Sequence, residues 1–270
     1  MPSVKARGIV CLVHGVGEHI GRYQADGEAL AGAGYILAGF DQRDFGKSGG
    51  KRGHTPGLEA YFDDIDLFLA EVDRRYPDQQ RFLYGHSMGG ILVLAYPPIR
   101  KPALTGVIAT APVLKSSIEK QKLKVALAKV LGNVLPNLDM KSGIHSQMLS
   151  MDPLVANIYT SDLLVHPIVS TAWGKAMLDA IEIAFENAPF FPLPLLLMHG
   201  TKDEIAFPTS STEYAKLAPK GKVTLKMWEG FKHELHTDPE KAEVFKTMVD
   251  WLDKRLEKGL IPLMRITEYP

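Results

Sequence analysis

The stretch that decides the fold is Tyr84-Gly-His-Ser-Met-Gly-Gly90, which lies between an apolar run at 81–84 and an apolar helical run at 91–96. It matches the pattern G-x-S-x-G, in which a serine occupies a sharp turn between a strand and a helix. Small residues are needed two positions before and after the serine, because larger side chains there would clash with neighbouring elements. The stretch therefore predicts an α/β fold with Ser87 exposed at the carboxyl edge of a sheet, as a candidate nucleophile.

Short apolar runs on both sides of this stretch predict the other strands of a sheet that is covered on both faces. They lie at 8–14, 35–41, 81–84, 105–113, 194–199 and 223–228. Apolar residues at helical spacing predict a helix over 58–76, ended by Pro77, and a closing helix from Pro239 to about Leu256.

The segment between 115 and 191 has a different pattern, with amphipathic helical stretches such as 124–131 and no convincing strand. Strands and helices that alternate on both sides of such an insertion predict one open, mainly parallel sheet with helices on both faces. We therefore expect a core domain formed by 1–114 and 192–270, with 115–191 as an inserted helical cap, or lid.

Composition excludes several classes of protein. The chain has 270 residues, 46% of them apolar, and 31 Lys+Arg balance 31 Asp+Glu, so it is globular and has no net positive field to hold nucleic acid. Its single cysteine, Cys11, can form neither an internal disulfide nor a cysteine metal cluster. The first residues lack the apolar region of a signal peptide, and the longest apolar stretch, 189–198, is short and contains three prolines. We expect a cytoplasmic protein without a membrane span.

A serine hydroxyl needs a histidine to accept its proton and a carboxylate to orient that histidine. Asp203 follows the predicted strand at 194–199, and His233 lies in the loop after the predicted strand at 223–228. Since the carboxyl ends of parallel strands share one edge of a sheet, we expect Ser87, Asp203 and His233 to meet there.

Asp203 and His233 each have a competing neighbour. Glu204 stands beside Asp203 and His236 stands three residues after His233, and we interpret both as polar surface residues at a loop and at a helix start. His233 and His236 do not form the H-E-x-x-H pattern, and no clear third ligand accompanies them. We therefore predict no metal and no organic cofactor.

The turn His14-Gly-Val-Gly-Glu-His19 follows the first predicted strand and is of the kind that exposes a backbone N–H at the same edge of the sheet. We expect the backbone amides of Val16 and Met88 to face a developing oxyanion, with Met88 at the start of a helix. The side chains of His14 and Glu18 are expected to brace this turn by hydrogen bonds.

The same turn supports an alternative from another class, a dinucleotide-binding oxidoreductase. Gly15-x-Gly-x-x-x-Gly21 follows a strand and opens a helix, and Asp41 ends the next strand where a ribose-binding acid would lie. However, the third glycine is one residue late, and Glu18 would face the pyrophosphate. A non-catalytic binding protein of the same fold is a third alternative, against which the complete set of Ser87, Asp203 and His233 argues.

Five stretches together resemble the monoacylglycerol lipase and lysophospholipase branch of the α/β-hydrolase fold. They are 14–23, 40–49, 85–89, 161–166 and 199–203, and the resemblance extends from about residue 8 to about residue 256. It implies that Ser87 is the nucleophile, Asp203 the acid and His233 the base, and that the Val16 and Met88 amides form the oxyanion hole. The reaction it implies is acylation of Ser87 by a fatty ester, followed by attack of water assisted by His233.

The resemblance also implies the substrate, a lipid ester, and most specifically monoacylglycerol that yields glycerol and a fatty acid. A lysophospholipase and a general short- or medium-chain carboxylesterase remain alternatives with the same mechanism. The cap at 115–191 is implied to cover an apolar acyl tunnel and to make transient contact with a membrane or micelle surface. Apolar residues over 125–135, flanked by Lys122, Lys124 and Lys129, agree with such contact, and ordinary packing of the cap on the core explains them equally well.

The sequence departs from the family pattern at three places. Asp44 replaces the glycine of the D-x-R-G-x-G-x-S loop, and we expect it to adopt the left-handed backbone that Asp tolerates. Pro97-Pro98 is expected to end the helix after Ser87 at or before Tyr96. The tail at 261–270 has no counterpart in the family.

Overall fold

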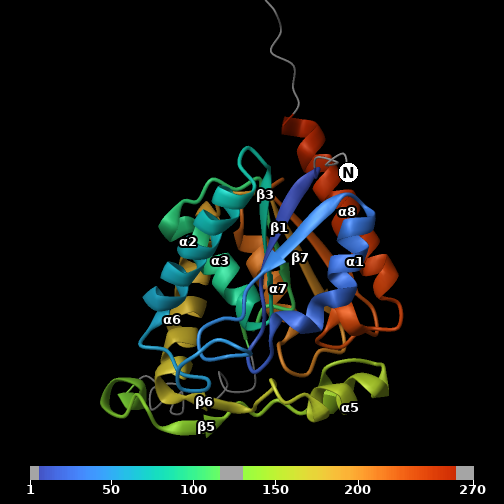
Figure 1. Cartoon of the computed structure of the whole chain (residues 1–270). Coiled ribbons are helices and arrows are strands. Elements are labelled where there is room, and N and C mark those ends of the chain that lie inside the picture. Colours follow the sequence, from blue (N-terminus) through green and yellow to red (C-terminus); the bar gives the residue numbers. More distant parts are fainter. Residues whose placement is uncertain (1–5, 116–129, 260–270) are drawn as a thin grey trace, which may run out of the picture.

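The computed structural model describes residues 6–115 and 130–259, which fold around a six-stranded sheet (Figure 1). All neighbouring strands of this sheet are parallel, in the order β2-β1-β3-β4-β7-β8. The strands are β1 (Gly8–Val13), β2 (Tyr35–Gly39), β3 (Arg81–His86), β4 (Gly106–Thr110), β7 (Leu195–Gly200) and β8 (Val223–Trp228). Each of the six runs predicted to be a strand thus contains a strand, and the predicted parallel α/β sheet is confirmed.

Helices cover both faces of the sheet (Figure 1). One face packs against α1 (Gln24–Gly32) and α8 (Lys241–Gly259), and the other against α2 (Leu58–Arg75), α3 (Met88–Arg100), α6 (Thr171–Asn187) and α7 (Pro208–Leu217). Strand β1 supplies both cores, because Ile9 and Cys11 point to one face while Val10 and Leu12 point to the other. Among the described residues, no helix is long and apolar enough to cross a membrane.

Helix α3 differs from the prediction, because it runs through Pro97 and Pro98 to Arg100 instead of ending at Tyr96. The two prolines cannot donate to the preceding turn, but the φ angle that their rings impose is compatible with a helix. Every residue from Met88 to Pro97 is buried, so packing keeps the segment helical. Lys101 caps the helix: it has a left-handed backbone (φ 52°), and its amide donates to the Pro97 carbonyl at 3.0 Å.

The segment between β4 and β7 crosses the carboxyl edge of the sheet (Figure 1). It contains α5 (Pro153–Ser161) and two short antiparallel strands, β5 (Asp139–Lys141) and β6 (Ile168–Ser170). The expectation of no strand in this segment was wrong, because three-residue strands are too short to give a period-2 pattern. Helix α6 packs closely on α3, and its small residues Ala176 and Ala180 are buried. The division into core and cap stays a prediction. The tail at 261–270 lies outside the described residues, as does most of the apolar helical stretch at 124–131.

Backbone hydrogen bonds tie β6 and the residues before it to the loops of the core. The Ser170 amide donates to the Gly53 carbonyl at 2.8 Å, and the His166 amide donates to the Gly17 carbonyl at 3.1 Å. Gly53 and Gly17 both have positive φ, and a Cβ on either would come within 2.6 Å of a backbone carbonyl oxygen of the insertion. These glycines let the insertion lie directly on the core.

The approach of α3 to β1 gives a prediction about stability. A Cβ on Gly89 would lie 1.9 Å from the Val13 carbonyl oxygen and 2.7 Å from that of His14. We expect Gly89→Ala to lower the free energy of unfolding by about 2–3 kcal/mol, because the end of β1 would have to move. Denaturant unfolding followed by circular dichroism measures this.

The matched control is Gly32→Ala in α1, where nothing lies within 4 Å of the new Cβ. Here alanine is expected to raise the free energy of unfolding by up to about 1 kcal/mol, because it is the better helix former. Equal effects of the two substitutions would contradict the steric argument.

Candidate active site

Ser87 occupies the turn between β3 and α3. Its backbone is left-handed (φ 56°, ψ −113°), a strained conformation for a serine, and its amide donates to the Thr110 carbonyl on β4 at 2.9 Å. A Cβ on Gly85 would lie 2.2 Å from the Gly89 carbonyl oxygen, so the turn closes only with glycine at this position. The G-x-S-x-G turn therefore has the geometry that its sequence predicts.

The structure brings Ser87, His233 and Asp203 into one hydrogen-bonded chain. His233 Nε2 lies 2.8 Å from Ser87 Oγ, and His233 Nδ1 lies 2.7 Å from Asp203 Oδ2. Asp203 follows β7 and His233 follows β8, so the carboxyl ends of β3, β7 and β8 position the three side chains. All three residues are buried. With Nδ1 protonated and donating to Asp203, Nε2 is the atom that can accept the serine proton.

Asp203 is held as a carboxylate by several donors. Its Oδ1 accepts hydrogen bonds from the amides of Ile205 and Ala206, and its Oδ2 lies 3.0 Å from His199 Nε2. Burial alone would raise the pKa of Asp203, but the charge of His233 and the hydrogen bonds from His199 and His233 hold that pKa well below its usual range. Sequence reasoning gave His199 no role, and its position four residues before Asp203 was the only signal.

His233 has the opposite shift. Burial would lower the pKa of this imidazole, but the Asp203 carboxylate and its hydrogen bond, aided by Glu234 and Glu18, raise the pKa above its usual value. The environment thus stabilises the imidazolium that forms when the histidine accepts a proton.

The turn after β1 is braced as expected. His14 Nδ1 donates to the Gly15 carbonyl at 2.8 Å, and the Gly15 amide donates to Glu18 Oε1 at 2.5 Å. Val16 lines the cavity beside Ser87, and Met88 begins α3, where a backbone N–H has no partner within the helix. Both predicted oxyanion residues therefore flank Ser87, and their catalytic role stays a prediction.

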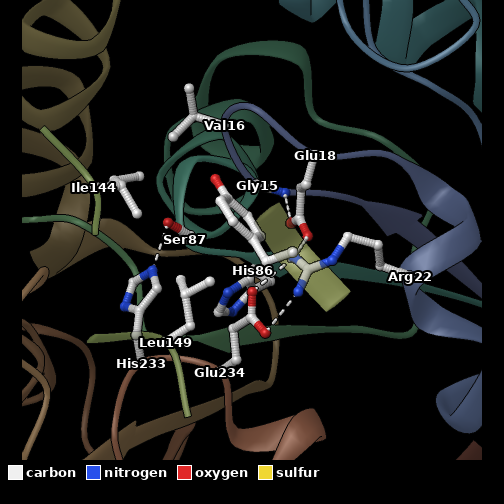
Figure 2. Close-up of a pocket in the computed structure, with 11 residues that line it drawn as sticks. Gly15, Val16, Glu18, Arg22, His86, Ser87, Ile144, Leu149, His233 and Glu234 are labelled. Atoms are coloured by element: carbon white, nitrogen blue, oxygen red, sulfur yellow. Dashed lines mark hydrogen bonds and ion pairs between the residues drawn. The ribbon is translucent and has the colours of Figure 1, made fainter. Parts of the chain in front are cut away.

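Sequence reasoning missed a buried ion-pair cluster in the same cavity. Arg22 Nη1 lies 2.7 Å from Glu18 Oε2 and 2.7 Å from Glu234 Oε1, and its Nη2 lies 2.9 Å from Glu234 Oε2 (Figure 2). We call Glu18, Arg22 and Glu234 the carboxylate–arginine cluster. The four-residue spacing of Glu18 and Arg22 could have suggested one pair, whereas Glu234 is 212 residues from Arg22 and gave no signal.

Residues of the insertion line one side of the cavity. Leu149 accepts a backbone hydrogen bond from the Glu234 amide at 2.7 Å, and the Tyr159 ring lies 4.9 Å from the Arg22 guanidinium. With Ile144, these residues leave about 10 Å³ beside Ser87, room for about one water molecule.

The two residues considered as alternatives to Asp203 and His233 differ in burial. Glu204 is exposed, as expected, whereas His236 is buried, so its assignment as a surface residue was wrong. His236 lies in a short turn that precedes α8, and its ring stacks on Tyr23 with centroids 4.5 Å apart. Burial lowers the pKa of His236 to about 3, so the ring is neutral. Within residues 6–115 and 130–259, no group of three His, Cys, Asp or Glu could hold a metal ion.

The residues of the dinucleotide alternative build the loops around the site. Asp41 Oδ1 accepts from the Ile20 amide at 2.9 Å and Oδ2 accepts from the Lys47 amide at 2.7 Å. Both carboxylate oxygens of Asp41 thus accept hydrogen bonds from backbone amides of these loops. In the same loop, Asp44 has φ 66°, which confirms the expected left-handed conformation.

Comparison with known proteins agrees with this geometry. The family model described as "Serine aminopeptidase, S33" matches residues 4–240. A monoglyceride lipase of Rattus norvegicus is 30% identical over 94% of this chain and 85% of that protein. The chain belongs to the S33 family of α/β-hydrolases, in the monoglyceride lipase branch.

Another member of this α/β-hydrolase branch has a very similar structure. The crystal structure of a monoacylglycerol lipase from Paleococcus ferrophilus has a TM-score of 0.85 and 38% identity, over 92% of this chain and 95% of that one. An abhydrolase domain-containing protein of Dictyostelium discoideum is 36% identical over 96% of this chain. That protein is longer, and the match spans 27% of its length.

The raised pKa of His233 gives a prediction about pH. His233 must be neutral to accept a proton, so kcat/KM for an uncharged, dissolved ester is expected to fall as pH drops, with a midpoint above the usual value of about 6.5. Asp203→Asn is expected to move that midpoint down and to lower kcat by about 10³-fold or more. Glu204→Gln, an exposed neighbour, is the control and should leave the profile unchanged. A flat wild-type profile between about pH 5 and 8 would contradict the role of His233.

Proposed function

We propose that this chain is a serine hydrolase that releases the fatty acid from monoacylglycerols through an acyl-enzyme on Ser87. The observation that carries the proposal is the hydrogen-bonded order Ser87, His233, Asp203 at the carboxyl edge of a parallel sheet. The choice of an acylglycerol is supported by relatives that are named monoglyceride and monoacylglycerol lipases.

In the proposed acylation step, Ser87 Oγ forms a bond to the ester carbonyl carbon while His233 Nε2 takes the hydroxyl proton. The carbonyl oxygen becomes an oxyanion, which accepts hydrogen bonds from the Val16 and Met88 amides. The bond to the alcohol then breaks, and His233 returns its proton to the leaving oxygen. Glycerol departs and the acyl group stays on Ser87.

Deacylation repeats these steps with water as the nucleophile. Water oxygen forms a bond to the acyl carbon while His233 takes one of the water protons; the bond between that carbon and Ser87 Oγ then breaks, and His233 returns the proton to Oγ. Asp203 stays ionised throughout and stabilises the imidazolium in both steps. The products are a fatty acid and the free enzyme.

The polar cavity beside Ser87 supports glycerol as the leaving alcohol. Glu18, Arg22 and Glu234 line it, and their polar atoms can meet the two free hydroxyls of a monoacylglycerol. The alcohol part of a simple short-chain alkyl ester has no free hydroxyls and cannot form these hydrogen bonds. The cavity therefore favours a monoacylglycerol over the substrates of a general carboxylesterase.

Substitution of the nucleophile tests the reaction. We expect Ser87→Ala to lower kcat for a medium-chain monoacylglycerol by about 10⁴-fold or more, because no other group can form the acyl-enzyme. Ser161→Ala, whose hydroxyl donates to Ile158 in its own helix, is the matched control and should keep wild-type activity. Fatty acid release by Ser87→Ala at the wild-type rate would refute the mechanism.

The proposal includes contact of the insertion with a lipid surface. Leu154 and Ile158 stand four residues apart on α5 with 63% and 61% of their surface exposed, and Leu163 just after the helix is 98% exposed. The nine residues of α5 include no charged side chain. Clustered exposed apolar side chains are typical of surfaces that dock on a protein or on lipid, and the proposed substrate resides in lipid.

This contact is tested by the double substitution Leu154→Glu and Ile158→Glu. We expect a loss of about tenfold or more in turnover of monoacylglycerol in vesicles, because two apolar side chains no longer enter the lipid. Hydrolysis of a dissolved short-chain ester should be unchanged. Leu67→Glu on α2, where the leucine is 71% exposed, is the matched control. Equal losses in the two variants, or a loss with the dissolved ester as well, would argue against lipid contact through α5.

A further inference from the structure

The carboxylate–arginine cluster gives the cavity beside Ser87 a net charge. The side chains of Glu18, Arg22 and Glu234 are 3%, 7% and 2% exposed, so water screens them little. Glu18 accepts hydrogen bonds from the Gly15 amide, Tyr23 Oη and Arg22, and Glu234 accepts from Arg22 and Thr237 Oγ1. The backbone amide and the guanidinium can only donate, so each glutamate has at least one oxygen that accepts from such a group. Two negative charges and one positive charge leave an excess of one negative charge.

The positive charge of Arg22 is engaged by its two carboxylates. Nη1 donates to both Glu18 and Glu234, and Nη2 completes a bidentate pair with Glu234. A phosphate group could bind this guanidinium only by displacing a buried carboxylate, which would then stand unpaired. Arg22 is therefore not available as an anion-binding residue.

The cluster lies where the leaving alcohol must pass. In the proposed mechanism His233 protonates the leaving oxygen, so the alcohol lies next to His233, and Glu234 lines the same cavity as His233 and Ser87. On the other side, Glu18 Oε1 and Ser87 Cβ lie 2.6 Å and 3.3 Å from the position of a Cβ on Gly15, which places them within about 6 Å of each other. Figure 2 shows Glu18, Arg22 and Glu234 together on one side of Ser87, with Ile144 on the other.

We infer that the carboxylate–arginine cluster selects the alcohol part of the ester by charge, accepting neutral glycerol and rejecting alcohols that carry a phosphate, with Glu234 as a specificity-determining residue. The inference rests on the proposed function, because it concerns the alcohol released in that reaction. For a separation of about 6 Å between the excess charge and a phosphate, in a site of intermediate polarity, Coulomb's law gives discrimination of about a hundredfold.

The test compares two esters that differ only in charge. A 1-acylglycerol and the 1-acylglycerol 3-phosphate with the same medium-length chain are presented in the same neutral detergent micelles, and kcat/KM is measured for each. We expect the wild type to prefer the neutral ester by about a hundredfold. Glu234→Gln removes one negative charge at nearly constant shape, so this preference should fall by about tenfold or more, chiefly through faster hydrolysis of the phosphate ester.

Three controls separate charge from shape. Glu229→Gln makes the same change at an exposed position of the same loop and should keep the wild-type preference. Glu234→Asp retains the charge and should keep the preference even if both rates fall. Labelling of Ser87 by a fluorophosphonate reports that each variant has a folded, reactive site.

The outcomes distinguish this inference from the proposed function. A wild type that hydrolyses neither ester contradicts the proposed function itself. A wild type that hydrolyses both esters equally well overturns the charge selection and leaves the hydrolase standing, whatever the variants do. If Glu234→Gln lowers both rates with an unchanged preference, Glu234 has a structural role only and the inference is overturned.

Discussion

The backbone contact between Gly89 and the end of β1 is the constraint on which the site depends. It lets α3 begin directly against the Val13 carbonyl, so that Ser87 is held in a left-handed turn above the sheet. Strain of this kind costs about 1–3 kcal/mol, and the burial of Met88–Pro97 in α3 offsets it. Because the turn is fixed by backbone contacts, the Cβ of Ser87 has a defined position, and the hydrogen bond to His233 orients the hydroxyl.

Much of this arrangement is predictable from the sequence, for a physical reason. Parallel strands buried on both faces give continuous apolar runs, and the residues that follow such runs meet at one edge of the sheet. The sequence alone therefore predicts that Ser87, Asp203 and His233 lie together. The identity of their buried supports could not be predicted. His199 and His236 have ordinary sequence surroundings, and only the fold shows that one donates to Asp203 and the other stacks on Tyr23.

The parts that sequence reasoning missed depend on contacts distant in the chain or on packing that overrides local preference. Arg22 and Glu234 are 212 residues apart and meet only because the loops after β1 and β8 converge. Strands β5 and β6 are too short for a period to appear, and they exist because they pair with each other and because the core loops at Gly17 and Gly53 hold β6. Pro97 and Pro98 would end an exposed helix, but α3 is enclosed by β3, β4 and α6.

The hydrogen bond between the Gly15 amide and Glu18 has a consequence for the energetics of the reaction. It fixes the orientation of the peptide group between His14 and Gly15, and the His14 imidazole fixes the Gly15 carbonyl, which belongs to the same peptide group as the Val16 N–H. In the proposed mechanism, the Val16 dipole is thus oriented before any substrate arrives. Water around a developing oxyanion in solution must reorient, whereas these groups have already done so during folding. Part of the reorganisation energy of ester cleavage is therefore supplied by the stability of the native turn.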